Sequence, residues 1–216
     1  MNESDLDIER VVLSDIEENA YIVALKNADS CVIVDPGMEP LALINRLLTK
    51  RLTPEAILVT HGHWDHIGGV NLVRKHWSDV TIYVGVNDRS KLTDPNGNLS
   101  PWLSTPHKTY DADVSVTDGD TISVANLTFK ALWTPGHTSG HMVYLLETES
   151  RPIVFCGDLI FESGVGRTDI PDGNSVALYK SVTEKILTLP DQTLLYPGHG
   201  NSTTVGNERR FNPFLN

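Results

Sequence analysis

Short apolar runs bounded by turn residues recur through the first half of the chain and predict β-strands. These runs cover residues 8–13, 20–25, 31–34, 56–59 and 81–84. The run at 31–34 is apolar on both faces, which is typical of a strand buried inside a sheet. Helices are expected at 38–51, where apolar residues recur at helical spacing before a Thr-Pro stop signal, and at 68–77.

The second half repeats this plan. Strands are expected at 121–124, 127–133, 141–146, 153–156 and 193–196, and helices at 174–189 and 205–211. Between the halves, residues 87–106 are rich in Asp, Asn, Gly, Pro and Ser, which predicts a long surface excursion that overhangs a site. Two successive sets of strands followed by helices predict two sheets packed between helices.

Composition narrows the class of protein. Of the 216 residues, 40% are hydrophobic and 21% are charged, as is typical of a globular chain, and the length fits one large domain or two small ones. The 17 basic and 28 acidic residues give a net charge of −11 with no basic cluster, so a nucleic-acid partner is not expected. Every apolar run is far shorter than the roughly 20 residues that a membrane helix needs.

The termini and cysteines bear on location. The acidic N-terminal segment lacks the positive charge and apolar core of a secretory signal, which predicts a cytoplasmic protein. The two cysteines, Cys31 and Cys156, lie in apolar strand-like runs and are expected to be reduced core residues. The sequence carries no comparable signal for oligomeric state.

Histidine carries the clearest chemical signal, because five of the eight histidines lie at the ends of predicted strands. The segment His61-Gly62-His63-Trp64-Asp65-His66 places three imidazoles and one carboxylate within six positions, directly after a strand. Imidazole and carboxylate groups are common ligands of zinc, iron and manganese, and a solvated loop gains little from three such rings. This spacing therefore predicts a metal site.

Three further polar residues follow predicted strands later in the chain: His137, Asp158 and His199. Taken alone, His137 reads as a turn histidine and Asp158 as a helix or turn cap, although a carboxylate there could equally bridge two cations. Their joint occurrence at strand ends favours a shared role with the segment at 61–66.

Together these residues resemble the motif of the metallo-β-lactamase superfamily, and in particular its glyoxalase II branch, the hydroxyacylglutathione hydrolases, in a short form without the C-terminal helical domain. The resemblance extends from Asp35-Pro36-Gly37 to Asn212-Pro213-Phe214. It implies an α/β fold, an αββα sandwich of two mixed β-sheets flanked by helices, with residues 1–216 as a single domain and the site at one edge.

The resemblance also assigns ligands. One metal ion would be held by His61, His63 and His137, the other by Asp65, His66 and His199, with Asp158 bridging them. Two divalent ions are implied, zinc being expected and iron or manganese being alternatives. The implied reaction is hydrolysis of a small-molecule thioester such as S-lactoylglutathione by a hydroxide that bridges the two metals, with Asp65 and Asp158 as catalytic carboxylates.

Two positions outside the ligand set also match the family. Asp35 resembles an acid that orients a ligand loop through hydrogen bonds, the alternative being a simple turn aspartate. Arg167 falls where the family places a cation that grips a glutathione carboxylate, the alternative being a structural pair with Asp169. His141 is either a residue that supports a ligand or a structural histidine. Because only residues 200–216 follow His199, the thiol carrier stays open.

Other functions remain open. The segments 166–169 and 178–182 also resemble the persulfide dioxygenases, which use a single iron, whereas Pro197-Gly198-His199-Gly200 is closer to the two-metal hydrolases. A lactonase or β-lactamase would direct the same hydroxide at a cyclic ester or amide. A non-catalytic metal-binding protein is disfavoured, because every expected ligand position is filled.

Overall fold

A computed structural model of the chain describes residues 1–103 and 105–215, and its first sheet is built from the N-terminal half. After a short 3-10 turn, η1 (Glu3–Asp5), the strands lie side by side in chain order: β1 (Leu6–Leu13), β2 (Glu18–Leu25), β3 (Ser30–Val34), β4 (Thr53–Val59), β5 (Thr81–Gly85) and β6 (Val114–Val116). Strands β1 to β3 are antiparallel neighbours, whereas β3 to β6 run parallel. Parallel neighbours need crossovers, and α1 (Leu41–Lys50) and α3 (Val70–His76) provide two of them.

The second sheet is built from the C-terminal half. Its strands lie in the order β14 (Thr203–Thr204), β13 (Leu194–Pro197), β10 (Ile153–Gly157), β9 (Met142–Leu146), β8 (Leu127–Trp133) and β7 (Thr121–Val124). Strands β10 and β13 are parallel, and the other pairs are antiparallel. The connection from β10 to β13 carries a hairpin of β11 (Ile160–Phe161) and β12 (Gly164–Val165), followed by α5 (Ser175–Ser181) and η3 (Val182–Ile186).

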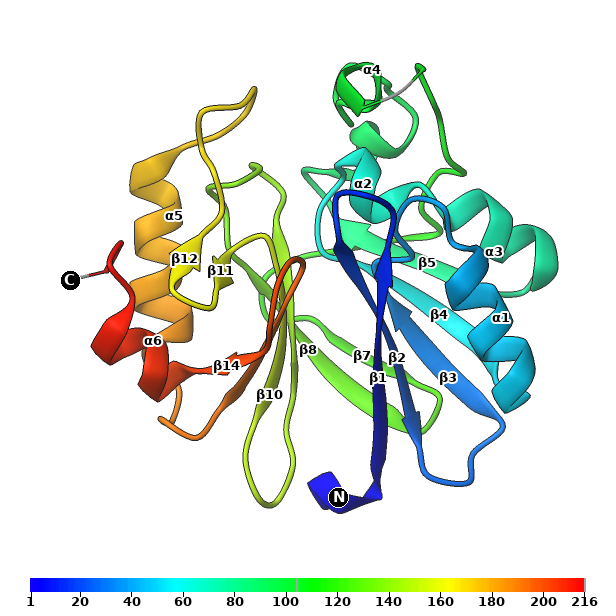
Figure 1. The fold of residues 1–216 in the computed structure, drawn as a ribbon, viewed down its shortest axis with the longest axis horizontal. Helices are drawn as coiled ribbons and strands as arrows, with labels where there is room; N and C mark the ends of the chain where they lie inside the picture. The colour runs from blue at the N-terminus through cyan, green and yellow to red at the C-terminus, as the bar shows by residue number, and fades with distance from the viewer. Residues whose placement is uncertain (104, 216) are drawn as a thin grey trace.

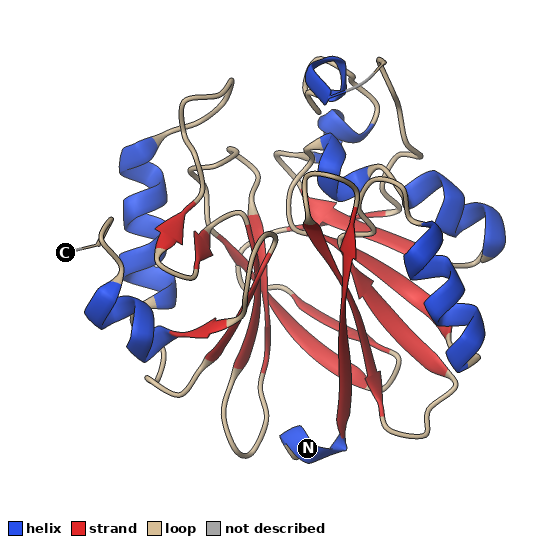
Figure 2. Ribbon diagram, in the orientation of Figure 1, coloured by secondary structure: helices blue, strands red, loops and turns tan. Residues whose placement is uncertain are grey.

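The two sheets face each other, and helices cover their outer faces (Figures 1 and 2). A central core between the sheets contains the large rings of Tyr21, Phe129, Tyr144 and Phe155, each 2% exposed or less. A second cluster packs α1 and α3 against the first sheet, and a third packs α5 and α6 (Val205–Phe211) against the second sheet. This αββα arrangement confirms the fold class expected from the sequence.

Several elements differ from the expectation. Residues Trp64–Ile67 form a short helix, α2, where a polar loop was expected. The reason is that Trp64 and Ile67 are buried in the cluster that packs helices against the first sheet. The helix expected at 174–189 is shorter, and its second half is the π-helical turn η3. Strands β6, β11, β12 and β14 were not predicted, because two or three residues are too few to leave a periodic signal.

The segment at 87–106 is only partly the surface excursion that the sequence suggested. It contains a 3-10 turn, η2 (Arg89–Leu92), and a short helix, α4 (Ser100–Leu103). Asp88, Leu92 and Asn98 are fully buried in it. The segment is also anchored on α2, because the Trp64 N–H donates to the Asn98 carbonyl at 2.8 Å. Its position is therefore fixed by polar contacts to the histidine-rich segment.

Two further expectations concern burial. Cys31 and Cys156 are both buried and unpaired, as expected for reduced core residues. Within residues 1–103 and 105–215, no helix combines the length and the apolar character that crossing a bilayer requires.

Candidate metal centre

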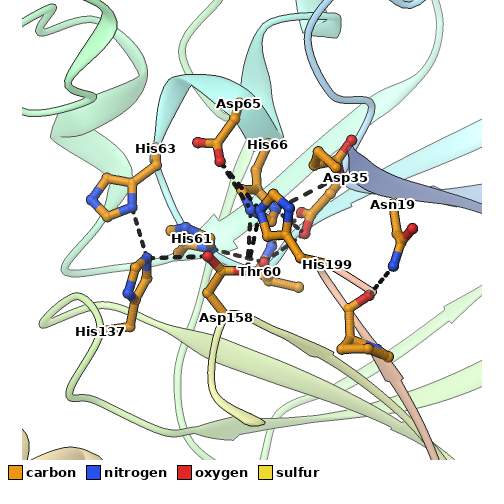
Figure 3. A network of polar contacts seen from close by, with 12 residues as sticks. Asn19, Asp35, Thr60, His61, His63, Asp65, His66, His137, Asp158 and His199 are labelled. Atoms are coloured by element: carbon orange, nitrogen blue, oxygen red, sulfur yellow. Dashed lines mark hydrogen bonds and ion pairs between the residues drawn. The ribbon is translucent and has the colours of Figure 1, made fainter. Parts of the chain in front are cut away.

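Five strands, namely β3, β4, β8, β10 and β13, are each followed by a polar residue of the candidate site. Figure 3 shows these polar side chains gathered in one place. Strands β3 and β4 run parallel, so Asp35 and the segment 61–66 leave the first sheet on one side. Strands β8 and β10 are both antiparallel to β9, and β13 is parallel to β10. His137, Asp158 and His199 therefore follow strands that point the same way, although long stretches of chain separate them.

His61, His63 and His137 form the first candidate ligand group, called here the first group. Their nearest ring nitrogens all lie within 4.8 Å of one another, and all three side chains are buried. The His137 Nδ1–H donates to the Arg167 carbonyl at 2.8 Å, which leaves its Nε2 lone pair directed at His63 Nδ1, 2.9 Å away. The Nδ1 of His61 lies 3.1 Å from the Thr60 hydroxyl, and its Nε2 faces the group.

Asp65, His66 and His199 form a second group, again with ligand atoms within 4.8 Å of one another. A carboxylate and a carbonyl can only accept, so His66 Nδ1–H donates to Asp35 Oδ2 at 2.9 Å and His199 Nδ1–H donates to the Ile16 carbonyl at 3.2 Å. In both rings Nε2 is therefore the nitrogen that faces the site and that would bind a cation. Those atoms lie 3.7 Å and 3.5 Å from Asp65 Oδ2.

Asp158 lies between the two groups (Figure 3). Its Oδ2 is 3.5 Å from His137 Nε2, and its Oδ1 is 3.4 Å from His66 Nε2 and 3.8 Å from His199 Nε2. The Asp158 N–H donates to His141 Nε2 at 3.1 Å, and the other His141 nitrogen contacts the Thr134 hydroxyl. His141 thus supports the backbone of Asp158 and is not placed among the ligand atoms of either group.

The unpaired atoms of the site test whether these residues suit cations. Within the described residues, four buried atoms of the two groups and Asp158 have no hydrogen-bond partner: His61 Nε2, His63 Nε2, His66 Nε2 and Asp158 Oδ1. Leaving a buried polar atom unpaired costs about 1–3 kcal/mol, so these neighbouring cases need an explanation. Imidazole nitrogen and carboxylate oxygen are donors that divalent zinc, iron and manganese accept. The residues present therefore fit two divalent cations.

The electrostatics of the histidines agree with this donor role. Burial, followed by electrostatic repulsion from the neighbouring His137 ring, lowers the pKa of His63 to about 4, and burial holds the pKa of His61 well below its usual range. Both rings are neutral near pH 7 and offer lone pairs. Burial also disfavours protonation of His66, but the carboxylates of Asp158 and Asp65 outweigh burial and raise its pKa well above the usual range. A cation in the second group must therefore displace a proton from His66.

Asp35 supports the second group through its hydrogen bond to His66. Its two carboxylate oxygens accept from the Thr60 N–H at 2.8 Å and the Thr60 hydroxyl at 2.6 Å, and one also accepts from His66. Asp35 adopts a left-handed backbone with φ +49°, which fits the tight turn after β3. Glu18 is fully buried behind this pair, 3.8 Å from His66 Nδ1, and burial raises the pKa of its carboxyl well above the usual range.

Asp88 is a residue that the sequence analysis missed. It is fully buried and accepts hydrogen bonds from the Gly62 N–H at 2.8 Å, the Thr138 hydroxyl at 2.7 Å and the Gly140 N–H at 2.9 Å. Gly62 lies between the first two histidine ligands, and Thr138 follows the third. Lys91 balances the charge, with its ammonium 2.5 Å from Asp88 Oδ1. One carboxylate thus ties together the two loops of the first group.

A cavity of about 420 Å³ opens beside the candidate ligands. His63, Asp65, His137, Asp158 and His199 form its floor. Its other walls include Ile16, Leu99, Trp102, Leu103, Phe161 and Arg167. Leu99, Trp102 and Leu103, from the stretch for which the sequence suggested an overhang, line the cavity.

Arg167 lines the cavity, but its guanidinium is engaged. Its Nε and Nη2 donate to the two carboxylate oxygens of Asp169 at 2.8 Å and 2.9 Å, and both side chains are exposed to solvent. The structural pair that the sequence left open is therefore present in this conformation. The backbone of Arg167 has a separate role, because its carbonyl orients the ring of His137.

Comparisons with known proteins agree with this geometry. An uncharacterized protein of Mycobacterium bovis is 41% identical over 210 residues, covering 91% of this chain and 92% of its own. The probable metallo-hydrolase YqgX of Bacillus subtilis is 38% identical over 208 residues, covering 96% of both chains. The hydroxyacylglutathione hydrolase GloC of Haemophilus influenzae is 31% identical over 221 residues, covering 98% of this chain and 99% of its own.

Solved structures and a family model give the same result. The crystal structure of the BLEG-1 B3 metallo-beta-lactamase has a TM-score of 0.91 and 38% identity over 97% of this chain and 99% of its own. The structure of TTHA1623 in a di-iron-bound form has a TM-score of 0.83 and 34% identity over 96% of this chain and 100% of its own. The model of the metallo-beta-lactamase superfamily matches residues 15–199. The chain therefore belongs to the metallo-beta-lactamase superfamily.

Proposed function

We propose that this protein is a metal-dependent hydrolase that cleaves a thioester bond in a small-molecule substrate. One observation carries the proposal: two groups of ligand side chains share Asp158, contain buried atoms without a protein partner among the described residues, and form the floor of an open cavity. Membership of the superfamily supports hydrolysis. The name of the Haemophilus relative, a hydroxyacylglutathione hydrolase, supports a thioester as the bond that is cleaved.

We assign His61, His63 and His137 to one divalent cation, and Asp65, His66 and His199 to another, with Asp158 between them. A bound pair of such ions lowers the pKa of water toward 7 and polarises a carbonyl group. Zinc is our first choice, with iron or manganese as alternatives, because imidazole and carboxylate ligands accept all three. The di-iron form of one similar structure keeps iron in consideration.

The two carboxylates at the cavity floor have separate tasks in this proposal. Burial opposes ionisation of Asp158, but the neighbouring His66 outweighs it and lowers the pKa of Asp158, so the residue stays a carboxylate and holds the two groups together. Asp65 also stays ionised, because His66 lowers its pKa against the effect of burial. In hydrolysis the water oxygen would bond to the thioester carbonyl carbon as the C–S bond breaks. Asp65 would accept the proton of the water and pass it to the departing thiolate.

Arg167 is the proposed substrate contact at the rim of the cavity. The guanidinium can contact a substrate carboxylate only by exchanging it for Asp169. Solvent screens an exposed ion pair of this kind strongly, so exchanging Asp169 for a substrate carboxylate costs little. We propose Arg167 as a contact at the cavity rim whose replacement by alanine raises KM for a glutathione thioester and leaves kcat unchanged.

Residues 1–216 are proposed to act as one domain, because the central core takes side chains from both halves of the chain. The cytoplasm is the proposed location, since both cysteines are buried and unpaired. A single-iron dioxygenase is the competing function. The second ligand group argues against a dioxygenase, because a single iron bound by the first group would leave Asp65 and His199 with no metal ion to bind.

Metal content and hydrolysis together test the proposal. Protein purified without chelators is expected to hold about two divalent ions per chain and to hydrolyse S-lactoylglutathione. His63→Ala and Asp158→Asn are expected to abolish hydrolysis while circular dichroism shows an intact fold. One iron per chain, together with oxygen uptake on a persulfide, would replace this proposal with the dioxygenase.

A further inference from the structure

The walls of the cavity are mainly apolar, whereas its floor is polar. The floor consists of ligand side chains, whereas Ile16, Leu99, Trp102, Leu103 and Phe161 make the walls mainly apolar. Three of these are large hydrophobic residues left open to solvent, with exposed fractions of 39% for Ile16, 63% for Trp102 and 45% for Leu103. Apolar surface gathered around a site in this way is typical of a surface that a ligand covers.

This apolar wall is built by fixed segments of the chain. Asn98, which precedes the α4 segment, is fully buried, and its side chain accepts from the Ser100 N–H at 2.9 Å and donates to the His107 carbonyl at 3.1 Å. The ring of His107 stacks on Trp64 with the ring centroids 4.6 Å apart. Polar contacts thus hold the backbone in place, while Trp102 and Leu103 project their side chains at the cavity.

The opposite wall directly adjoins the candidate ligands. The Ile16 carbonyl accepts from His199, while the Ile16 side chain lines the cavity. The Phe161 ring lies edge-on to His199, with centroids 6.2 Å apart. A group that occupied the space between Ile16, Phe161 and Trp102 would therefore lie beside the reacting bond.

Positive charge is scarce in this cavity. Among its described lining residues other than histidine, Arg167 is the sole cation, and Asp169 neutralises it. The chain as a whole carries a net charge of −11. Beyond the candidate cations themselves, little in the walls would attract a second carboxylate or a phosphate.

We propose that the cavity selects substrates whose acyl group is an uncharged, unbranched aliphatic chain of several carbons, held between Trp102, Leu103 and Ile16. The inference rests on the proposed function for its reaction, but it concerns the binding preference of the cavity. Each methylene that moves from water to an apolar wall is worth about 0.8 kcal/mol, which corresponds to about a fourfold gain in affinity. A short hydroxyacyl group would leave most of this wall uncovered.

Two measurements on the metal-loaded protein test this preference. The first is kcat/KM for thioesters of one small neutral thiol, N-acetylcysteamine, with acetyl, butanoyl, hexanoyl and octanoyl groups. The second is the Kd of the free acids, acetate to octanoate, by titration calorimetry, which needs no turnover. We expect both to improve about threefold to fourfold per methylene until the wall is covered.

Trp102→Ala is the diagnostic variant, because the side chain is mostly exposed and its loss does not endanger the fold. It should weaken octanoate binding about tenfold and acetate binding less than twofold. Tyr179→Ala is the matched control, since Tyr179 is 51% exposed on α5 and does not line the cavity. Its chain-length dependence should equal that of the parent protein.

The outcomes separate the two proposals. Thioester hydrolysis with a flat chain-length dependence, or a dependence that Trp102→Ala leaves intact, overturns the apolar cavity and keeps the hydrolase. Acid binding that strengthens with chain length, without cleavage of any thioester, keeps the apolar cavity and overturns the hydrolase.

Discussion

Replacement of Asp88 by alanine should damage both the fold and the first ligand group. The change removes the acceptor of the Gly62 and Gly140 N–H groups and of the Thr138 hydroxyl, all in the interior. It also takes one of two carboxylate partners from Lys91, whose other partner is Asp172 at 2.8 Å. Two tightly tied loops would thereby lose the group that joins them.

The size of the effect follows from burial. Breaking a buried ion pair by removing one partner costs about 3–5 kcal/mol, and the fully buried position of Asp88 places it in that class. Against a total stability of roughly 5–15 kcal/mol, the variant should still fold at 25 °C. Because residues that orient ligands typically change metal affinity by about 10–100-fold, the first cation should bind that much more weakly.

Two assays measure these effects. Urea unfolding of the metal-free protein gives the stability change, and competition with a chelator gives the metal affinity. Asp118→Ala is the matched control, because Asp118 also accepts from a backbone N–H and pairs with a lysine, Lys185, but at the surface. That change should cost less than about 1 kcal/mol. Equal losses in the two variants, or unchanged metal affinity in the Asp88 variant, would refute the reasoning.

Three further predictions concern the second ligand group and the metals. Gly198→Ala should prevent binding of the second cation, because the new methyl would overlap the Asp158 carboxylate and the His66 ring. Gly164→Ala is the control and should leave the metal content unchanged, because the nearest side-chain atom would lie 3.6 Å from its methyl. Lowering the pH from 8 to 6 should release the cation of the second group first, because the raised pKa of His66 lets protons compete with that cation, whereas the pKa of His61 in the first group is lowered. Metal content after dialysis at each pH measures this, and simultaneous loss of both ions would contradict it. Chelation should lower Tm in calorimetry, because the unpaired buried atoms then lose their partners; an unchanged Tm would mean that no cation binds there.

Local sequence predicted much of the site. The ligands at 61–66 are close in the chain, so a single turn of backbone after β4 was enough to bring their side chains to one place. Most strands could also be predicted, since those of four or more residues leave a clear apolar pattern. The short strands were not predicted, because β11, β12 and β14 have two residues each and form only by pairing with neighbouring strands.

The sequence by itself determined the chemistry of the ligands, the classes of strand and helix, and the acidic character of the chain. Tertiary structure alone decided which distant residues meet, because sheet topology brings Asp158 and His199 to the edge that holds His61. It also decided that Asp88 is a buried residue joining two loops by hydrogen bonds, and that Arg167 is paired with Asp169. Burial and long-range hydrogen bonding fix the role of Asp88, which has no local signature in the sequence. The Arg167–Asp169 pair is an exposed contact between residues two positions apart, which the sequence had left open as one of two alternatives.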